Sequence, residues 1–368
     1  MTNCRTCKSE RLYLFLPLGD HPLANGFLRK NQLSEEEPRF PLDVHACLDC
    51  GLIQVDDQIP AGFFRHYVYI PSSADAMHPH FEGLAEKLAK QLPSTDALTI
   101  DIGCNDGLFL SFLRTRGART LGIDPAENIA ELAREKGVDV VTEYFTPDLA
   151  RRIREEHGPA QVVVTTNTFH HIGDLDPFTQ GVTILLADDG IFVVEVPHAQ
   201  ELVELNQFDG VYHEHVSQHT VKSFVDHFRL FGLEVFDVER LDVHGGSIRV
   251  FARPTRNGGA PSPSVQTWLD EESRRKLFDV ETYDGFRERV ERIRAELTRM
   301  LEESKAAERR IVGYGASARG NTLLNYYGIG PDILEFLADR NQLKQGKYSP
   351  GTHIPVVSPD VIADTKPD

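Results

Sequence analysis

Residues Leu98 to Gly107, Leu-Thr-Ile-Asp-Ile-Gly-Cys-Asn-Asp-Gly, decide the fold of this chain. An apolar run that ends on an acid and a glycine turn predicts a buried strand, a loop and then a helix from Leu108. Gly103 and Gly107 allow a tight turn and a close approach of the backbone to a ligand, to which the helix presents free N–H groups. The next expected strand ends on Asp124, where a carboxylate can hold ribose hydroxyls. The pattern predicts the nucleoside end of an α/β cofactor site, and the alternative is a βα turn with no ligand.

The kind of cofactor follows from what this turn lacks. A dinucleotide fingerprint reads G-x-G-x-x-G, but Leu110 stands where the third glycine belongs. Three acids crowd the turn, namely Asp101, Asp106 and Asp124. They would repel a pyrophosphate and attract a cationic sulfonium that carries an amino-acid tail. The stretch therefore resembles motif I of methyltransferases that use S-adenosylmethionine (SAM), and this resemblance implies SAM as the cofactor.

Composition limits the class of protein. A chain of 368 residues is expected to form two or three domains. Its formal net charge of -17 argues against general nucleic-acid binding, which needs a basic surface. No apolar run is long enough to span a membrane and no signal peptide precedes Cys4, so we expect a cytoplasmic protein.

Four of the five cysteines form two C-x-x-C pairs, Cys4 with Cys7 and Cys47 with Cys50. Each pair brings two thiolates to one side of a turn, and two pairs complete a tetrahedral zinc site with four sulfur ligands. Four protein ligands close the site, so we expect a structural role for the zinc. The alternatives are free surface thiols and a redox C-x-x-C, but a redox motif needs only one pair.

Strand and helix patterns alternate between residues 98 and 196, as a parallel sheet requires. Ligand loops of such sheets gather at the carboxyl ends of the strands. Two loops are therefore of interest, Thr166 to His171 after the fourth expected strand and the residues from Val194 to His198 at the end of the fifth. The expected strands are Leu98–Ile102, Thr120–Ile123, Val138–Val141, Gln161–Thr165 and Gly190–Val196. The expected helices are Leu108–Arg116, Ala126–Lys136, Pro147–His157 and Pro177–Leu186, preceded by a helix from His80 to Gln91.

The stretch Tyr212-His213-Glu214-His215 concentrates groups that move protons. General acid–base catalysis is the preferred interpretation, because histidine titrates near neutrality and Glu214 can fix the tautomer of a neighbouring imidazole. A metal site is one alternative, since His213 and His215 have H-x-H spacing, although no third ligand has a convincing spacing. The other alternative is a helix N-terminus with solvated histidines.

Further candidates lie outside these motifs. The connector from Phe63 to His80 is rich in aromatic residues and histidine, including Tyr69, and packing between domains and substrate contact are equally good interpretations. A β-hairpin is expected from strands Glu234–Val238 and Ser247–Ala252, and its turn carries His244. A linker at Asn257–Ser264 and a charged helix at Tyr283–Arg309 follow, with no functional assignment.

A second glycine turn follows a strand in the C-terminal part of the chain. Gly313 to Gly320 matches G-x-G-x-x-A, and Asp339 ends the next expected strand, a pattern that by itself suggests NAD. The short tail offers few strands for such a site, and Arg319 at the start of the helix could hold a phosphate instead. A further strand is expected near Val356, and we expect the sheet to be unfinished in this sequence.

Taken together and in this order, the motifs resemble the three-domain sugar-nucleotide C-methyltransferases of deoxysugar pathways. The motifs are the paired C-x-x-C, Asp-Ile-Gly-Cys-Asn-Asp-Gly, Tyr-His-Glu-His, His-Gly-Gly-Ser and Gly-Tyr-Gly-Ala-Ser-Ala-Arg-Gly-Asn-Thr-Leu-Leu-Asn-Tyr. The resemblance implies an α/β fold with a zinc-binding domain (1–75), a Rossmann-like SAM-binding methyltransferase domain (76–235) and a C-terminal Rossmann-like domain (236–368) that does not use NAD. It also implies a nucleoside-diphosphate 4-keto-6-deoxysugar as substrate, usually linked to dTDP. We expect a monomer that binds neither nucleic acid nor a membrane.

The resemblance also implies roles for individual residues. Zinc is expected on Cys4, Cys7, Cys47 and Cys50. SAM contacts are expected from Asp101, Gly103, Asn105, Gly107, Asp124 and Asn167. Catalysis is expected from Tyr212, Glu214 and His215, with His171 facing them. The candidates for substrate binding are Tyr69, His244, Ser247 and Arg319.

The chemistry of a 4-keto sugar needs these groups. The ketone acidifies the hydrogens on the neighbouring carbons, so a base can remove one and leave an enolate that attacks the methyl group. We expect His215 to be the base, Glu214 to orient it, and Tyr212 or His171 to donate to the enolate oxygen. Two rival functions are a nicotinamide-dependent oxidoreductase that uses Gly313–Gly320 and a non-catalytic zinc protein that binds a partner or RNA. The acidic net charge argues against RNA.

Overall fold

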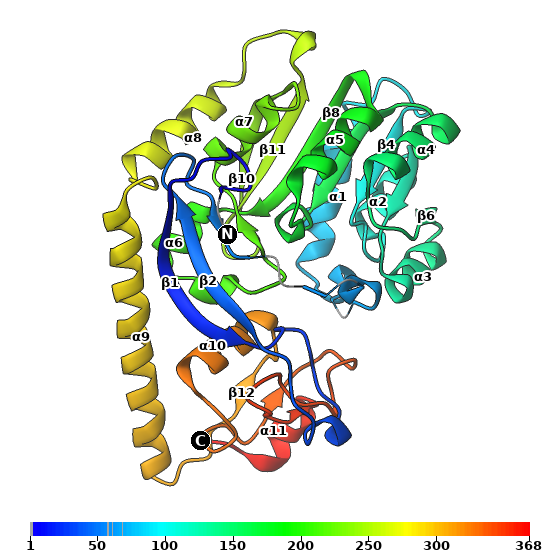
Figure 1. The fold of residues 1–368 in the computed structure, drawn as a ribbon. Coiled ribbons are helices and arrows are strands. Elements are labelled where there is room, and N and C mark those ends of the chain that lie inside the picture. The colour runs from blue at the N-terminus through cyan, green and yellow to red at the C-terminus, as the bar shows by residue number, and fades with distance from the viewer. Residues whose placement is uncertain (1–2, 57–58, 61, 68) are drawn as a thin grey trace.

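The computed structural model describes residues 3–56, 59–60, 62–67 and 69–368 of the chain. Strands in these residues form three sheets, of which the largest has the order β10-β11-β8-β7-β4-β5-β6. Figure 1 shows this sheet with its helices in the upper part of the molecule and the C-terminal residues at the bottom, with β1 and β2 between them. The strands of the large sheet are β4 (Leu98–Ile102), β5 (Arg119–Ile123), β6 (Val140–Val141), β7 (Ala160–Thr166), β8 (Leu186–Pro197), β10 (Leu233–Leu241) and β11 (Ser247–Pro254).

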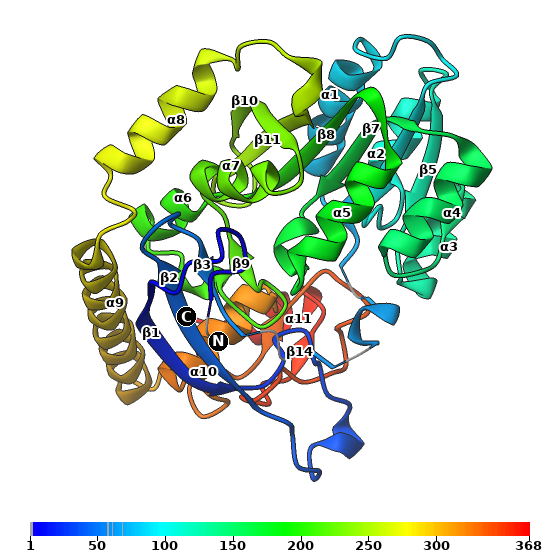
Figure 2. The same cartoon turned by 45° about the horizontal axis from the view of Figure 1, so that its top comes forward.

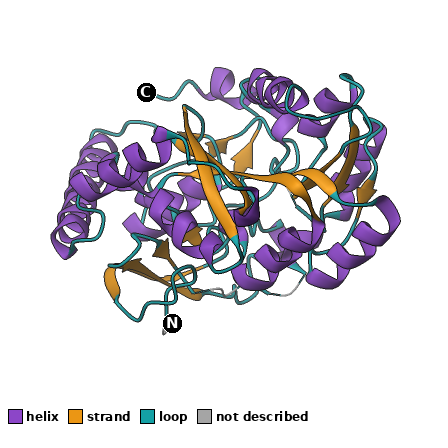
Figure 3. Ribbon diagram, turned by 90° about the horizontal axis from the view of Figure 1, so that it is seen from above, coloured by secondary structure: helices purple, strands orange, loops and turns teal. Residues whose placement is uncertain are grey.

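Helices cover both faces of the large sheet, so its middle strands are buried on both sides (Figure 3). Val163 and Val194 share one core with α4, α5, α7 and α8, whereas Val164 and Val193 share another with α1, α2 and α3. The alternation of side chains along β7 and β8 produces this division. The helices are α1 (Met77–Ala89), α2 (Leu108–Arg114), α3 (Glu127–Glu135), α4 (Pro147–His157), α5 (Leu175–Leu185), α6 (Ala199–Glu204), α7 (Val221–Arg229) and α8 (Pro263–Arg274).

The strands and helices expected between residues 98 and 196 are confirmed, with ends that differ by a few residues. β4 pairs in parallel with β5 and β7, and β7 pairs in parallel with β8. The carboxyl ends of these strands therefore lie at one edge of the sheet, where the acid–glycine turn after β4 and the loop after β7 come together.

The predicted hairpin is present, but it belongs to the large sheet. β11 pairs antiparallel with both β10 and β8, so the sheet continues to Pro254. The expected domain boundary at residue 235 falls inside β10. The reason is burial: β11 is apolar on both faces, with Val250 in one core and Phe251 in the other, and only an inner position covers both. The expected domain limits stay predictions.

A four-stranded sheet joins the N-terminal residues to the middle of the chain. Its order is β1-β2-β3-β9, and β9 comes from residues just after the Tyr212–His215 stretch. The N-terminal sheet therefore holds that stretch in place, and Figure 2 shows β3 and β9 beside the large sheet and its helices. The strands are β1 (Leu12–His21), β2 (Phe40–Cys47), β3 (Ile53–Gln54) and β9 (Ser217–Gln218).

The C-terminal residues form a small parallel sheet, β12-β13-β14, in which each strand has two residues. The long helix α9 leads to it, and Tyr283 and Phe286 of this helix pack on Phe15 of β1 with ring centroids 4.8 and 5.8 Å apart. Within the described residues, no helix is both long and apolar enough for a membrane span. The elements are α9 (Val280–Ala306), β12 (Gly313–Tyr314), α10 (Ala318–Tyr327), β13 (Leu337–Ala338), β14 (Val356–Val357) and α11 (Asp360–Thr365).

Candidate active site

A cleft of about 850 Å³ lies where the three parts of the chain meet. The N-terminal part contributes Asn25, the large sheet contributes the turn after β4 and the loop after β7, and the C-terminal part contributes Arg319 and Lys344. A cleft of this size is at the upper end of the range for small-molecule sites. It has room for a cofactor at the sheet edge and a second ligand that reaches the C-terminal part.

The turn between β4 and α2 has the backbone geometry that the sequence predicts. Gly103 and Gly107 have φ of 79° and 70°, and Asn105 also takes a left-handed conformation with φ of 48°. A Cβ at Gly103 would overlap the side chain of Thr168, and one at Gly107 would lie 2.9 Å from the Cβ of Ala133. Packing against neighbouring elements therefore requires both glycines, in addition to any approach of a ligand.

Two of the three acids at this turn have the surroundings of a site for a cation. Asp101 is buried, and its Oδ1 has no hydrogen-bond partner among the described residues. Burial, and then the nearby Asp124 carboxylate, raise the pKa of Asp101 to about 8. Asp124 accepts backbone N–H bonds from Asn105 (2.9 Å) and Ala126 (2.8 Å). An ammonium group next to Asp101 would provide its missing partner and stabilise the ionised carboxylate, which fits the amino-acid tail of SAM.

The third acid has another role. Asp106 is buried and forms an ion pair with Lys136 of 2.5 Å between Oδ2 and Nζ. Its charge is therefore neutralised within the protein, and the attraction of a sulfonium to this side of the turn rests on Asp101 and Asp124. Asn167, the last residue expected to contact SAM, lies in the loop after β7 with φ of 52° and lines the cleft. Such strained positions concentrate at functional sites.

If Asp124 holds the ribose of SAM, as we propose, Asp124→Ala should weaken SAM binding by roughly 2–4 kcal/mol, because charge-assisted hydrogen bonds are lost. Calorimetric titration with SAM measures the effect. The affinity of Asp124→Asn should lie between those of the wild type and Asp124→Ala, because asparagine keeps one acceptor oxygen. Asp139→Ala, which removes an exposed carboxylate outside the cleft, is the matched control. Wild-type affinity in Asp124→Ala would mean that this carboxylate does not hold the ribose.

His215 and Tyr212 form a hydrogen-bonded pair inside the cleft. Nδ1 of His215 lies 3.0 Å from the carbonyl oxygen of Gly210, which can only accept, so this nitrogen carries the proton. Burial, followed by the neighbouring His171, lowers the pKa of His215 well below its usual range, so the ring is neutral. Nε2 therefore accepts the hydroxyl proton of Tyr212 at 2.6 Å. The lone pair of the imidazole thus faces a phenol, with the rings of His170 and His171 4.3 and 4.9 Å away.

The structure corrects the expected role of Glu214. Its carboxylate accepts two hydrogen bonds from Nδ2 of Asn25 (2.9 and 2.8 Å) and one from the hydroxyl of Tyr67 (3.2 Å). Both nitrogens of His215 have other partners, so Glu214 does not orient that ring. Burial raises the pKa of Glu214 to about 7. Asn25 and Tyr67 were not singled out by the sequence, although Tyr67 belongs to the aromatic connector.

His213 and His215 do not form a joint metal site, and the stretch is not a solvated helix N-terminus. His213 is buried and its Nε2 lies 3.1 and 3.2 Å from the carbonyl oxygens of Phe40 and Pro41. It therefore points toward β2, and the H-x-H pair does not form a joint metal site. The histidines are not solvated at a helix N-terminus either, because the segment is a turn packed under the N-terminal sheet.

Three of the four substrate candidates line the cleft. Tyr69 is 41% exposed at its edge, and His244 and Arg319 lie along its wall. Arg319 forms two bonds of 3.0 Å with Asp209. Ser247 does not reach the cleft, because its hydroxyl is buried and donates to the carbonyl of Val243 at 3.0 Å. Its place at the start of β11 explains this orientation.

The second glycine turn opens onto the same cleft. Ser317, Ala318 and Arg319 at the start of α10 line it, together with Lys344, which the sequence analysis did not single out. Asp339, the acid that would hold a nicotinamide cofactor's ribose, accepts the backbone N–H groups of Ala316 and Asn341, each at 2.8 Å. Each strand before and after this turn has only two residues, so the sheet around it is too small for a typical dinucleotide site.

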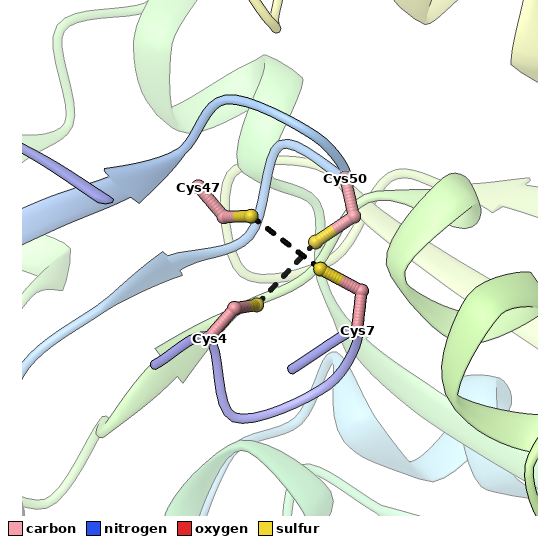
Figure 4. Close-up of side chains that lie close together, drawn as sticks. All are labelled: Cys4, Cys7, Cys47 and Cys50. Atoms are coloured by element: carbon pink, nitrogen blue, oxygen red, sulfur yellow. Dashed lines mark hydrogen bonds between the residues drawn. The ribbon is translucent and has the colours of Figure 1, made fainter. Parts of the chain in front are cut away.

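The four paired cysteines converge as Figure 4 shows. Sγ of Cys4 lies 3.5 Å from Sγ of Cys50, and Cys7 and Cys47 are separated by the same distance. All four sulfurs lie within 4.8 Å of one another. A tetrahedral ZnS₄ site has sulfur–sulfur distances of about 3.8 Å, so the donor set fits zinc. The site would then be structural, with four protein ligands and no open position.

The two C-x-x-C turns also hold segments next to the cleft. From the first pair, Nε of Arg5 donates to the carbonyl of Gly173 (2.8 Å), in a loop that lines the cleft, and Nη2 donates to that of Val55 (3.0 Å). From the second, the carbonyl of Cys50 accepts the hydroxyl proton of Thr220 at 2.5 Å. The metal site therefore stabilises segments on both sides of β9.

Comparison with protein families covers most of the chain. Residues 4–63 match a model described as "Putative zinc binding domain", residues 78–238 a "Methyltransferase domain" and residues 242–368 a "C-methyltransferase C-terminal domain". C-methyltransferase NovU from Streptomyces niveus is 37% identical over 367 residues, which cover 99% of this chain and 87% of that protein. A mitochondrial ubiquinone biosynthesis O-methyltransferase from Bos taurus is 31% identical over 114 residues, 29% of this chain and 31% of that protein.

About half of the chain is also similar to two solved structures. A SAM-dependent methyltransferase from Anabaena variabilis has a TM-score of 0.40 and 17% identity, covering 50% of this chain and 87% of its own. Magnesium protoporphyrin IX methyltransferase from Synechocystis PCC 6803, with bound SAH, has a TM-score of 0.38 and 17% identity, covering 48% and 82%.

Proposed function

The chain belongs to the SAM-dependent C-methyltransferases with an N-terminal zinc-binding domain, and from this premise we propose that it methylates a carbon beside the ketone of a nucleoside-diphosphate 4-keto-6-deoxysugar. The observation that supports this most directly is the Tyr212–His215 pair. It lies in a cleft that has an acid-lined turn at one end and the cations of Arg319 and Lys344 at another. These are the groups that a sulfonium, an enolate and a diphosphate require.

The cofactor end of the cleft is built by the large sheet. Asp101 would pair with the ammonium group of SAM and Asp124 with its ribose hydroxyls, while Gly103 and Asn105 of the turn would contact the rest; Gly107, also expected to contact SAM, does not line the cleft. When bound, SAM supplies an electrophilic methyl group. Its reacting carbon must lie about 3–3.5 Å from the nucleophilic carbon of the sugar for direct transfer.

His215 is the proposed base. Its buried ring is neutral, and Nε2 has a lone pair once the Tyr212 hydroxyl turns away. Nε2 then takes the proton from the carbon beside the ketone. Tyr212, released from the imidazole, donates its hydroxyl to the developing enolate oxygen. The bond from Nδ1 to the Gly210 carbonyl holds the ring in the required tautomer and stabilises the imidazolium that forms. His171 is a second possible donor to the oxygen.

The C-terminal part would bind the nucleotide diphosphate. Arg319 offers a planar guanidinium suited to phosphate oxygens, and Lys344 adds a second positive charge from the loop after β13. The first turn of α10, capped by Ser317, adds free backbone N–H groups. We propose dTDP as the nucleotide, Tyr69 and His244 as further substrate contacts, and a monomeric enzyme.

Mass spectrometry of reactions with SAM and a panel of dTDP-4-keto sugars tests the function. A sugar nucleotide that gains one methyl group is the expected product, and reactions with S-adenosylhomocysteine in place of SAM are the control. Tight binding of NAD(P)H without binding of SAM would favour the oxidoreductase instead. Methyl transfer to no member of a panel that varies in nucleotide and sugar would overturn the proposed substrate class.

Arg319→Gln should raise the KM for the sugar nucleotide by about 10–100-fold, because a hydrogen bond to a charged group is worth about 1.5–3 kcal/mol. The affinity for SAM should be unchanged, since Arg319 belongs to the other end of the cleft. Steady-state kinetics at saturating SAM measure the change. Arg309→Gln, at an exposed position outside the cleft, is the matched control. An unchanged KM would exclude Arg319 as a phosphate ligand.

A further inference from the structure

Three histidines meet at the wall of the cleft, away from the four cysteines. His170 and His171 belong to the short turn after β7, and His215 comes from the stretch before β9. One ring nitrogen from each of them lies within 4.8 Å of the other two. The ring centroid of His170 lies 4.4 Å from that of His171 and 4.3 Å from that of His215. Two separate parts of the fold therefore bring three imidazoles to one point.

His170 has no protein partner that would explain its burial. It is 2% exposed, and neither of its ring nitrogens has a hydrogen-bond partner among the described residues. Nδ1 of His171 is buried and lacks a partner in the same way. Buried polar atoms nearly always have a hydrogen-bond partner or a bound ligand, so the absence of protein partners here indicates a ligand site. All three side chains line the cleft, from which a small ligand can reach them.

The charge state of the cluster suits a metal ion. An imidazole is mostly neutral near pH 7, because its ordinary pKa is about 6.5, and the neutral ring is the form that binds metals. Imidazole ligands favour zinc, nickel, cobalt and copper over magnesium or calcium.

We propose that His170, His171 and His215 form a second metal site that takes a divalent transition-metal ion, such as Zn²⁺, Co²⁺ or Ni²⁺. Three protein ligands leave a position open toward the cleft, unlike the closed site of the four cysteines. A metal ion there would bind Nε2 of His215 and so replace the hydrogen bond between this nitrogen and the Tyr212 hydroxyl. Occupation of the site would therefore inhibit methyl transfer, a consequence that rests on the proposed function.

Cobalt reports this site directly. The full chain with its zinc in place is titrated with Co²⁺ in the absence of SAM and sugar nucleotide. We expect binding of about one further metal ion per chain, with visible d–d absorption but without thiolate-to-cobalt charge-transfer bands, as three nitrogen ligands require. The zinc content, measured after the titration, shows whether the cysteine site has exchanged its metal.

His170→Asn and His171→Asn should each weaken cobalt binding by about 100-fold or more, since even the loss of a hydrogen-bond partner of a metal ligand costs about 10–100-fold. His157→Asn, a partly exposed histidine at the end of α4, is the matched control and should bind cobalt as the wild type does. Unchanged zinc content and thermal unfolding show that a variant is folded.

Two results would overturn the metal site: no cobalt beyond the zinc equivalent in the wild type, or wild-type cobalt binding in both folded variants. Because the titration contains no substrate, its outcome is independent of the substrate panel. Failure of methyl transfer with every sugar nucleotide would contradict the proposed function and leave the metal site as it stands. Inhibition of wild-type methyl transfer by cobalt, reversed by a chelator, is expected if both proposals hold.

Discussion

His215→Asn should slow methyl transfer by about 10²–10⁴-fold, the usual contribution of the general base that we propose His215 to be, while SAM and the proposed sugar nucleotide still bind. Neither ligand depends on the basicity of the ring, and asparagine keeps a polar group of similar reach near the Gly210 carbonyl. Single-turnover rates with both substrates saturating measure the chemical step without product release.

Hydrogen exchange separates proton removal from methyl transfer. Wild-type enzyme in deuterated water, with S-adenosylhomocysteine in place of SAM, should introduce deuterium at the carbon beside the ketone, and His215→Asn should not. Tyr212→Phe is the informative partner variant: it should keep some exchange but slow it, because the hydroxyl stabilises the enolate and does not remove the proton.

If His215→Asn exchanges at the wild-type rate, the base lies elsewhere. The geometry then favours His171, whose ring centroid is 4.9 Å from that of His215. Tyr212 as a phenolate is the third possibility, although burial raises the pKa of this phenol well above its usual range. Exchange in His171→Asn and in Tyr212→Phe would distinguish the two.

Cys47→Ser should abolish zinc binding and loosen the two cysteine turns, whereas the N-terminal sheet keeps the apolar core that it shares with α9 and α10. Binding of a structural zinc is worth about 10–16 kcal/mol in small zinc domains, and much of this is folding free energy. The cysteines sit in a cluster of their own with little apolar core around it, so few other contacts can compensate. Metal analysis and thermal unfolding measure the two effects.

The fifth cysteine provides the control for this experiment. Cys104 is buried in the core beneath α1 and α2 and does not belong to the zinc cluster, so Cys104→Ser should retain its zinc. Methyl transfer should slow in Cys47→Ser, because Arg5, which lies between Cys4 and Cys7, donates to the carbonyl of Gly173 in a loop that lines the cleft. Full metal content in a Cys47→Ser, Cys50→Ser double variant would refute the four-thiolate site.

The sequence alone determined the parts of this protein that depend on short spacing. The strand, glycine turn and helix at residues 98 to 114 need only local geometry and a buried run, so the pattern predicted them correctly. The sequence also placed Asp124 correctly at the end of the next strand, β5. The two C-x-x-C pairs predicted a four-sulfur cluster because each pair is a local turn, and the ligand preference of zinc unites them.

The tertiary structure decided what each polar side chain touches. Glu214 meets Asn25 and Tyr67, which are 189 and 147 residues away in the chain, instead of the adjacent His215. Because Glu214 and His215 are adjacent in the sequence, a hydrogen bond between their side chains was expected. Successive residues in a turn point in different directions, so Glu214 meets Asn25 whereas His215 meets Tyr212 and Gly210.

The same reason explains the other differences. Ser247 is buried at the start of β11, an inner strand whose place in the sheet depends on its pairing with β8, which starts 61 residues earlier. The cluster of His170, His171 and His215 unites two segments that share no sequence pattern. Local periodicity predicts the conformation of a single segment. Contacts between distant segments depend on how sheets and helices pack against one another, and that packing is a property of the whole fold.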